Sequence, residues 1–72
     1  MYKVAVINQP RQKEETFDFG TFQKAYAYFA EKCDFQNIDF EPFSEEDVKK
    51  NEITAGGIGC DFELKISYNN GN

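Results

Sequence analysis

The stretch FQKAYAYFAEKCD, residues 22–34, carries the clearest helical pattern in the chain. Apolar side chains recur along it three or four residues apart, and charged residues fall mostly outside the resulting stripe. Thr21 comes directly before it and is a favoured N-cap residue. The sequence therefore predicts an amphipathic helix over residues 22–34, with one face in a core. The apolar stripe consists of Phe22, Ala25, Tyr26, Phe29 and Cys33.

The segments farther out on both sides of this helix have the pattern of β-strands. Residues 2–8 are β-branched and apolar on both faces, which predicts a central strand. Residues 14–19 alternate and follow a polar loop that contains Pro10, so these two segments predict a hairpin. From Ile58 to Tyr68 every second residue is apolar, which predicts a strand with one face in the core and one in water.

Two shorter strands are also predicted. Residues 36–41 alternate and end at Pro42, which lacks a backbone N–H and so favours an edge position. Residues 52–55 predict a brief strand, and the glycine-rich stretch AGGIG at residues 55–59 predicts a turn after it.

A second, short helix is predicted over residues 45–50. Ser44 and Asp47 have the spacing of a capping box, with Asp in place of the usual Glu or Gln. Acidic residues fall in its first turn and lysines in its last turn, which suits the helix dipole at both ends.

The predicted order of elements defines the fold class as α+β. We expect a small two-layer sandwich in which an antiparallel sheet of about three to five short strands packs against the main helix, residues 22–34. The short second helix, residues 45–50, accompanies it. Residues 1–69 are expected to form one compact domain, and residues 70–72 a frayed tail. Eight Phe and four Tyr supply much of the apolar area that so short a chain needs.

Charge excludes several classes of function. The formal net charge is −5, which argues against direct binding to nucleic acids or anionic membranes, because both need a basic patch. No apolar run approaches the length of a membrane span, and the apolar N-terminal run is too short for a signal peptide. We therefore expect a cytoplasmic protein that is attracted to basic partners.

The residue types that carry most enzyme chemistry are missing or isolated. The chain has no His and no C-x-x-C pair, so common general bases and zinc-site patterns are absent. Neither a phosphate-binding loop nor a calcium-binding EF-hand loop is present. We therefore expect no enzyme activity, no cofactor and no metal. Cys33 and Cys60 are expected in the core as free thiols, with a disulfide as the alternative.

The run CDFQNIDFEPFSEED, residues 33–47, combines six carboxylates with no Lys or Arg. Its apolar side chains are expected in the core: Phe35, Ile38, Phe40 and Phe43. The acidic residues could form a docking surface for a basic partner. The alternative is a solvated acidic edge that blocks sheet-to-sheet aggregation.

The candidate partner-binding surface combines this acidic run with one residue of the main helix. Tyr28 falls about 100° from the centre of the apolar stripe, so its side chain is expected either exposed for partner binding or at the edge of the core with its hydroxyl group in water. The predicted partner-binding residues are Tyr28, Asp34, Asp39, Glu41, Glu45, Glu46 and Asp47.

Small size, acidity and the lack of catalytic residue types suggest a class of function. In these respects the chain resembles the compact acidic proteins that phages and mobile elements use against host defence, including anti-CRISPR and anti-restriction proteins. The resemblance implies a non-enzymatic inhibitor that binds or masks a basic, nucleic-acid-handling protein, such as a host nuclease, by charge mimicry of nucleic acid. The alternative is a structural or assembly protein that forms a homodimer through aromatic and edge-strand contacts.

Overall fold

The structure, a computed structural model, describes residues 1–69 of the chain. Two strands are followed by two helices and then by two more strands. The predicted tail at residues 70–72 lies outside the described residues. The elements are β1 Tyr2–Asn8, β2 Lys13–Phe19, α1 Phe22–Phe35, α2 Glu45–Lys50, β3 Ile53–Gly56 and β4 Phe62–Tyr68.

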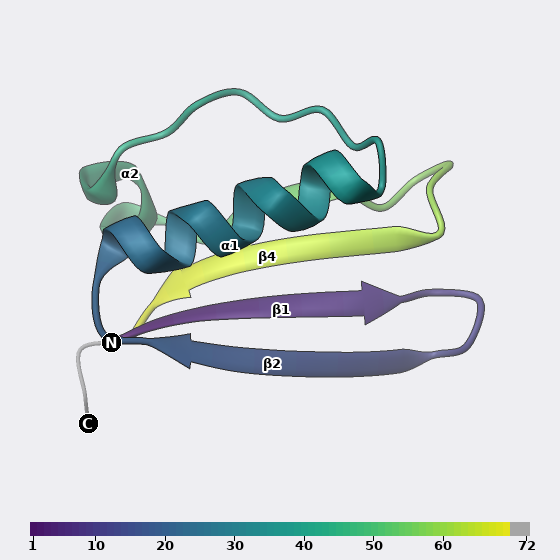
Figure 1. Cartoon of the computed structure of the whole chain (residues 1–72), viewed down its shortest axis with the longest axis horizontal. Coiled ribbons are helices and arrows are strands. Elements are labelled where there is room, and N and C mark those ends of the chain that lie inside the picture. Colours follow the sequence, from purple (N-terminus) through teal and green to yellow (C-terminus); the bar gives the residue numbers. More distant parts are fainter. Residues whose placement is uncertain (70–72) are drawn as a thin grey trace.

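The four strands form one antiparallel sheet in the order β2-β1-β4-β3 (Figure 1). β1 lies in the centre, as its apolar residues on both faces predicted, and pairs with β4 along its whole length. Beyond this ladder the Met1 ammonium group donates a hydrogen bond to the Asn69 carbonyl oxygen over 2.8 Å. The Asn69 N–H donates to the Met1 carbonyl oxygen, also over 2.8 Å. The centre of the sheet therefore joins the first strand of the chain to the last.

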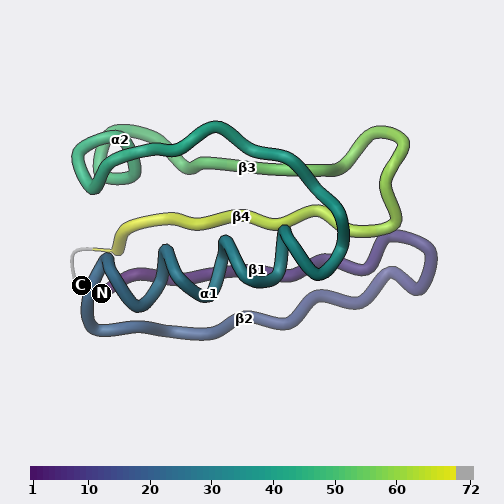
Figure 2. Tube along the Cα trace, turned by 45° about the horizontal axis from the view of Figure 1, so that its top comes forward, coloured from purple at the N-terminus to yellow at the C-terminus, as the bar shows by residue number. Residues whose placement is uncertain are grey.

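The helices form a second layer on one face of the sheet, which confirms the predicted small α+β two-layer fold. α1 contacts β1, β2 and β4, and α2 contacts β4. Between the helices, residues 36–44 run back beside α1 on the β3 side of the sheet (Figure 2). Within residues 1–69, neither helix has the length and apolar character needed to cross a membrane.

Aromatic rings fill the core between the two layers. Phe29 is fully buried, and its ring centroid lies 5.1 Å from that of Phe40 and 5.4 Å from that of Phe43. Phe22 and Tyr26 of α1 extend the cluster through further ring contacts with Phe43. This dense aromatic packing gives a short chain a large buried apolar area. The other large, fully buried side chains are Leu64, Ile66, Val4 and Cys33.

Side chains cap both helix starts at the predicted positions. The Thr21 hydroxyl oxygen accepts a hydrogen bond from the Lys24 N–H over 3.3 Å. The Ser44 hydroxyl oxygen accepts from the Asp47 N–H over 3.2 Å, and the Asp47 carboxylate accepts from the Ser44 N–H over 2.9 Å. The capping box at α2 is therefore confirmed.

The predicted strand at residues 36–41 is wrong, although its alternation is present in the structure. Ile38 is buried and Phe40 half-buried, whereas Asp39 between them is exposed. The segment joins no sheet within residues 1–69. Asn37, with φ of 57°, follows α1, and the chain then continues within the helix layer. The alternating residues therefore belong to an extended segment that packs one side against α1 and does not pair with a strand.

The last strand begins at Phe62, four residues later than predicted. A turn precedes it, in which the Cys60 N–H donates to the Gly57 carbonyl oxygen over 3.0 Å. Glycines in and before this turn have φ between 79° and 98°, a left-handed conformation that interrupts the strand. Ile58 and Cys60 are exposed as a result, so the prediction that Cys60 enters the core is wrong.

Phe35 was also predicted in the core, and this prediction is wrong because 78% of the residue is exposed. It is the last residue of α1 and comes two positions after the buried Cys33. Two residues correspond to about 200° around a helix, so Phe35 lies on the side opposite the apolar stripe.

The two cysteines, both free, should differ sharply in reactivity. Burial raises the pKa of the Cys33 thiol to about 11, and Cys33 has no exposed surface, as its place in the helix stripe predicted. Because the thiolate is the reactive form, we expect a chromogenic disulfide reagent at pH 8 to modify Cys60 alone. Cys33 should react only after unfolding in guanidinium chloride. Rapid labelling of a folded Cys60→Ser variant would contradict the burial of Cys33.

Candidate functional site

An open acidic groove lies between the segment 39–43 and strand β3, with a volume of about 370 Å³. The segment forms one wall, and Ile53 and Thr54 of β3 form the other. Three acidic residues, Asp39, Glu41 and Asp47, line it together with apolar residues. The groove therefore offers negative charge over a partly apolar surface.

The end of α1 and packing against the core together position the segment 39–43, which forms one wall of the groove. The Ile38 N–H donates to the Cys33 carbonyl oxygen over 2.8 Å, which directs the chain back along the helix. Phe40 and Phe43 then pack against Phe29, with 5.8 Å between their own ring centroids. Because the rings face the core, the acidic side chains of the same segment remain exposed at the groove.

Asp47 has two roles at the groove. It caps α2 through Ser44 and also lines the groove. The hydrogen bonds from the backbone and side chain of Ser44 lower the pKa of the Asp47 carboxyl group. These bonds favour the charged form, so the carboxylate keeps its charge at neutral pH and into mildly acidic solution.

The structure brings together three of the seven predicted partner-binding residues at this groove: Asp39, Glu41 and Asp47. Of the other acidic residues, Asp34 is exposed in the last turn of α1, and Glu46 is exposed on α2. Neither lines the groove.

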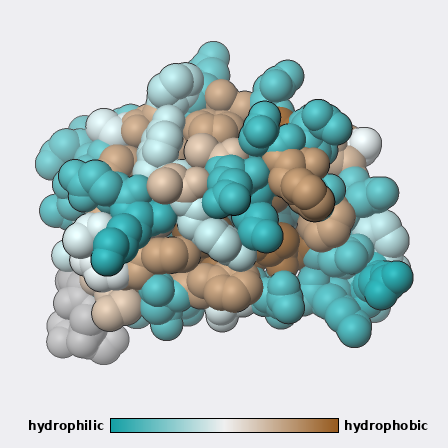
Figure 3. Space-filling model, in the orientation of Figure 1, coloured by the Kyte–Doolittle hydropathy of each residue, from teal (hydrophilic) through white to brown (hydrophobic). Residues whose placement is uncertain are grey.

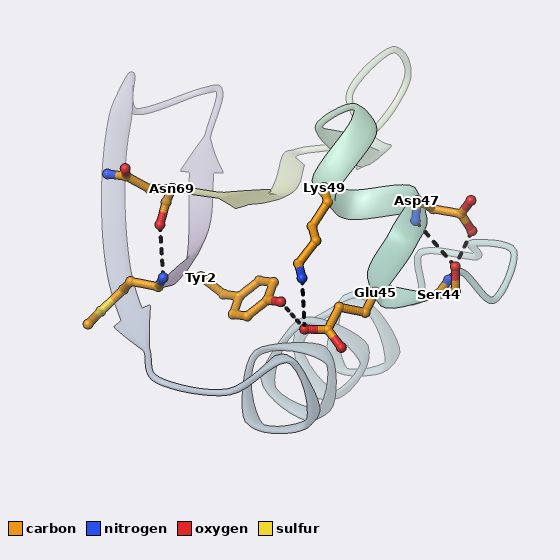
Figure 4. A network of polar contacts seen from close by, with 7 residues as sticks. Tyr2, Ser44, Glu45, Asp47, Lys49 and Asn69 are labelled. Carbon is orange, nitrogen blue, oxygen red and sulfur yellow. Dashed lines mark hydrogen bonds and ion pairs between the residues drawn. The ribbon is translucent and has the colours of Figure 1, made fainter. Parts of the chain in front are cut away.

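Glu45 interacts within the fold. Its carboxylate accepts a hydrogen bond from the Tyr2 hydroxyl group, and the Lys49 ammonium nitrogen lies 3.9 Å from the same oxygen (Figure 4). Burial, followed by the hydrogen bond to Glu45, raises the pKa of Tyr2 to about 12. The carboxylate therefore links α2 to the first strand of the sheet.

Tyr28 is half-buried at the edge of the core, the second of its two expected positions. Its ring centroid lies 5.1 Å from that of Phe17 and 5.3 Å from that of Phe19, and the Lys32 ammonium nitrogen lies 5.4 Å from its centroid. In Figure 3 hydrophobic residues form brown areas on this side of the molecule, between α1 and β2. Tyr28 thus covers aromatic residues of β2 and lies apart from the acidic groove.

Sequence reasoning missed a second depression, of about 190 Å³, near the β1–β2 turn. Its lining brings Arg11 and Lys13 together with Glu15, Val6 and Phe62. The basic residues were visible in the sequence, but their approach to β4 depends on the order of strands in the sheet. Its lining mixes positive and negative charges, which gives this depression less chemical definition than the acidic groove.

In comparisons with known proteins, no family model, curated protein or solved structure gives a significant match to this chain. The described part of the chain also has no group of three or more His, Cys, Asp or Glu residues suited to holding a metal ion. The acidic groove is therefore the feature of this molecule that points most directly to a function.

Proposed function

We propose that this chain is a non-enzymatic binding protein whose acidic groove docks on a basic surface of a partner protein. The observation that supports this proposal most directly is the meeting of Asp39, Glu41 and Asp47 at one open groove. Within residues 1–69, no Lys or Arg forms an ion pair with any of these three carboxylates. A basic partner would supply direct ion pairs to these carboxylates.

The proposed partner is a nucleic-acid-handling protein, which the chain inhibits or masks. Such proteins present Lys and Arg toward phosphates, and carboxylates at the groove can occupy the same basic positions. The net charge of −5 adds long-range attraction. Exposed charges are screened by salt, so this mode of binding should weaken as ionic strength rises.

Reversing Asp39 and Glu41 to Lys is expected to reduce partner capture by about tenfold or more, because like charges then face the basic surface. Asp47 is left unchanged, since its carboxylate also caps α2. The measurement is affinity capture from a bacterial lysate at 50 and 500 mM salt, with captured proteins quantified by mass spectrometry. A captured protein should also lose nucleic-acid binding when the wild-type chain is added.

A matched control reverses Glu14 and Glu31, which are exposed on β2 and α1 and do not line the groove. This variant has the same net charge as Asp39→Lys/Glu41→Lys and should retain most of the capture. Equal loss in both variants would show that overall charge, not the groove, governs binding. Capture that is unaffected by either reversal would overturn the proposal.

One observation favours the second candidate function, a homodimeric assembly protein. Phe17 of the edge strand β2 remains 37% exposed beside Phe19 and Tyr28. A second copy could cover these rings and bury apolar area. Sedimentation analysis of the purified protein separates the candidates, because only the second requires a dimer.

A further inference from the structure

The backbone of β3 presents free hydrogen-bonding groups toward the acidic groove. In an antiparallel ladder, residues that bond to the partner strand alternate with residues whose N–H and C=O groups point away. The Gly57 N–H donates to the Phe62 carbonyl oxygen over 3.1 Å, so the next bonded position toward the N-terminus is Ala55. Thr54 and Gly56 therefore direct their backbone groups away from β4.

These outward groups are not engaged by the segment that faces them. Within residues 1–69, no hydrogen bond joins the segment 39–43 to β3. Thr54 and Gly56 are both exposed, and an open volume of about 370 Å³ lies beside the strand. The edge of β3 is therefore accessible and unpaired.

The two edges of the sheet differ in their protection against strand pairing. β2 is KEETFDF, with four charged residues among seven, the kind of edge that resists pairing with another strand. β3 is ITAG and carries neither charge nor proline. β3 is short, with four residues, but it lacks the charged side chains and proline that commonly prevent the addition of another strand.

We infer that β3 receives an extended basic segment of the partner protein as an additional strand. This inference rests on the proposed function and specifies how the partner binds. The backbone of the guest segment would pair with Thr54 and Gly56, as in other cases of strand addition to an exposed sheet edge. β3 has four residues, so the paired part of the guest spans about 13 Å at 3.3 Å per residue.

The wall of the groove opposite β3 indicates which side chains the added partner segment should carry. Asp39 and Glu41 are two residues apart in an extended segment, about 6.6 Å along the chain, which matches the spacing of alternate residues in a strand. The half-buried Phe40 and Phe43 and the exposed Pro42 also contribute to the lining of the groove. Lys and Arg suit both features, because their aliphatic stems cover apolar surface while their charged ends reach carboxylates. The guest should therefore carry Lys or Arg at alternate positions.

The test uses a capped heptapeptide, Thr-Lys-Val-Lys-Val-Lys-Thr, titrated into ¹⁵N-labelled protein and followed by NMR. We expect a dissociation constant on the order of 0.1–1 mM for so short a segment. The amide resonances of Thr54 and Gly56 should shift, and their hydrogen exchange should slow by about tenfold at saturation. The same peptide with N-methyl groups on the alternate residues whose N–H groups would face β3 should bind about tenfold more weakly, because those donors are lost.

Two matched variants separate strand addition from simple charge attraction. Thr54→Pro removes an N–H that points away from β4, so it should preserve the sheet while weakening peptide binding by about tenfold or more. Thr16→Pro is the control on the other edge. Met1 and Asn69 exchange two hydrogen bonds, and from this position onward the residues of β1 bond alternately to β4 and to β2. By this alternation, the backbone N–H and C=O groups of Thr16 on β2 point away from β1. Circular dichroism checks that both variants fold, and the control should bind as the wild type does.

The outcomes distinguish this inference from the proposed function. Equal binding by Thr54→Pro and wild type, with loss of binding in Asp39→Lys/Glu41→Lys, would overturn strand addition and leave the acidic docking surface intact. Protection of β2 amides in place of β3 amides would also overturn it. If the heptapeptide does not bind at millimolar concentration, strand addition is wrong, and lysate capture decides the proposed function by itself.

Discussion

Replacing Phe29 with alanine should destabilise the fold by about 3–5 kcal/mol, the usual range for removing a buried aromatic side chain. Phe29 has no exposed surface and contacts the rings of Phe40 and Phe43. The substitution removes apolar contact area and leaves a cavity between the helix layer and the sheet. A chain of 72 residues typically has about 4–11 kcal/mol of total stability, so this change could consume most of it. Urea unfolding followed by circular dichroism measures the loss.

Phe35→Ala provides a control on the same helix with the same chemical change. Phe35 is 78% exposed, so we expect its removal to alter stability by less than about 0.5 kcal/mol. Similar destabilisation by both substitutions would contradict the burial that distinguishes the two phenylalanines.

Gly56→Ala is expected to have the second largest effect on stability, about 2–4 kcal/mol, through backbone strain and steric conflict. Gly56 has φ of 79°, in the left-handed region that alanine adopts with difficulty. A Cβ atom at this position would also lie 2.5 Å from the Phe62 carbonyl oxygen and 3.1 Å from the Ile38 side chain. Relief of this conflict requires movement of β3 or β4. Thermal unfolding at fixed pH provides the measurement.

Gly59→Ala separates the two causes. Gly59 has the same φ of 79°, but a Cβ atom there would meet no other atom within 4 Å. We expect a loss of about 1 kcal/mol from the backbone conformation alone. The difference between the two variants therefore measures the steric conflict with Phe62 and Ile38. If both variants lose the same stability, the close approach at Gly56 is absent in solution.

The elements that sequence reasoning identified correctly are those whose residue pattern has one structural explanation. The helical spacing from Phe22 to Cys33 fits only one face of a long helix, and Thr21 and Ser44 fixed the helix starts through their side chains. The position of β1 at the sheet centre followed from apolar residues on both faces. In these elements, local chemistry and tertiary packing favour the same conformation.

The errors arose where two structures share one pattern. Alternation at residues 36–41 is as compatible with an extended segment against a helix as with a strand, and only the tertiary structure distinguishes them. Alternation also continued from Phe62 back to Ile58, although positive φ at the glycines nearby prevents a strand there. Backbone conformation at glycine was therefore the information that alternation could not supply.

The candidate groove was predictable only in part. The exposure of Asp39 and Glu41 followed from their alternation with apolar neighbours. Their position opposite β3 depends on the path of the whole segment after α1, which no local pattern specifies. Glu45 was predicted to bind the partner because it lies, like Asp47, in the first turn of α2. In the fold its carboxylate contacts Tyr2 and does not line the groove.

The pairing of the first strand with the last constrains the order in which the chain can fold during synthesis. The β1–β2 hairpin needs only neighbouring residues, whereas the β1–β4 ladder joins residues separated by most of the chain. Closing so long a loop has an entropic cost, and folds with many such contacts form comparatively slowly. A nascent chain that lacks β4 leaves the apolar side of β1, including Val4, without its central partner. The two-layer fold can therefore be completed only after the ribosome has added the last strand.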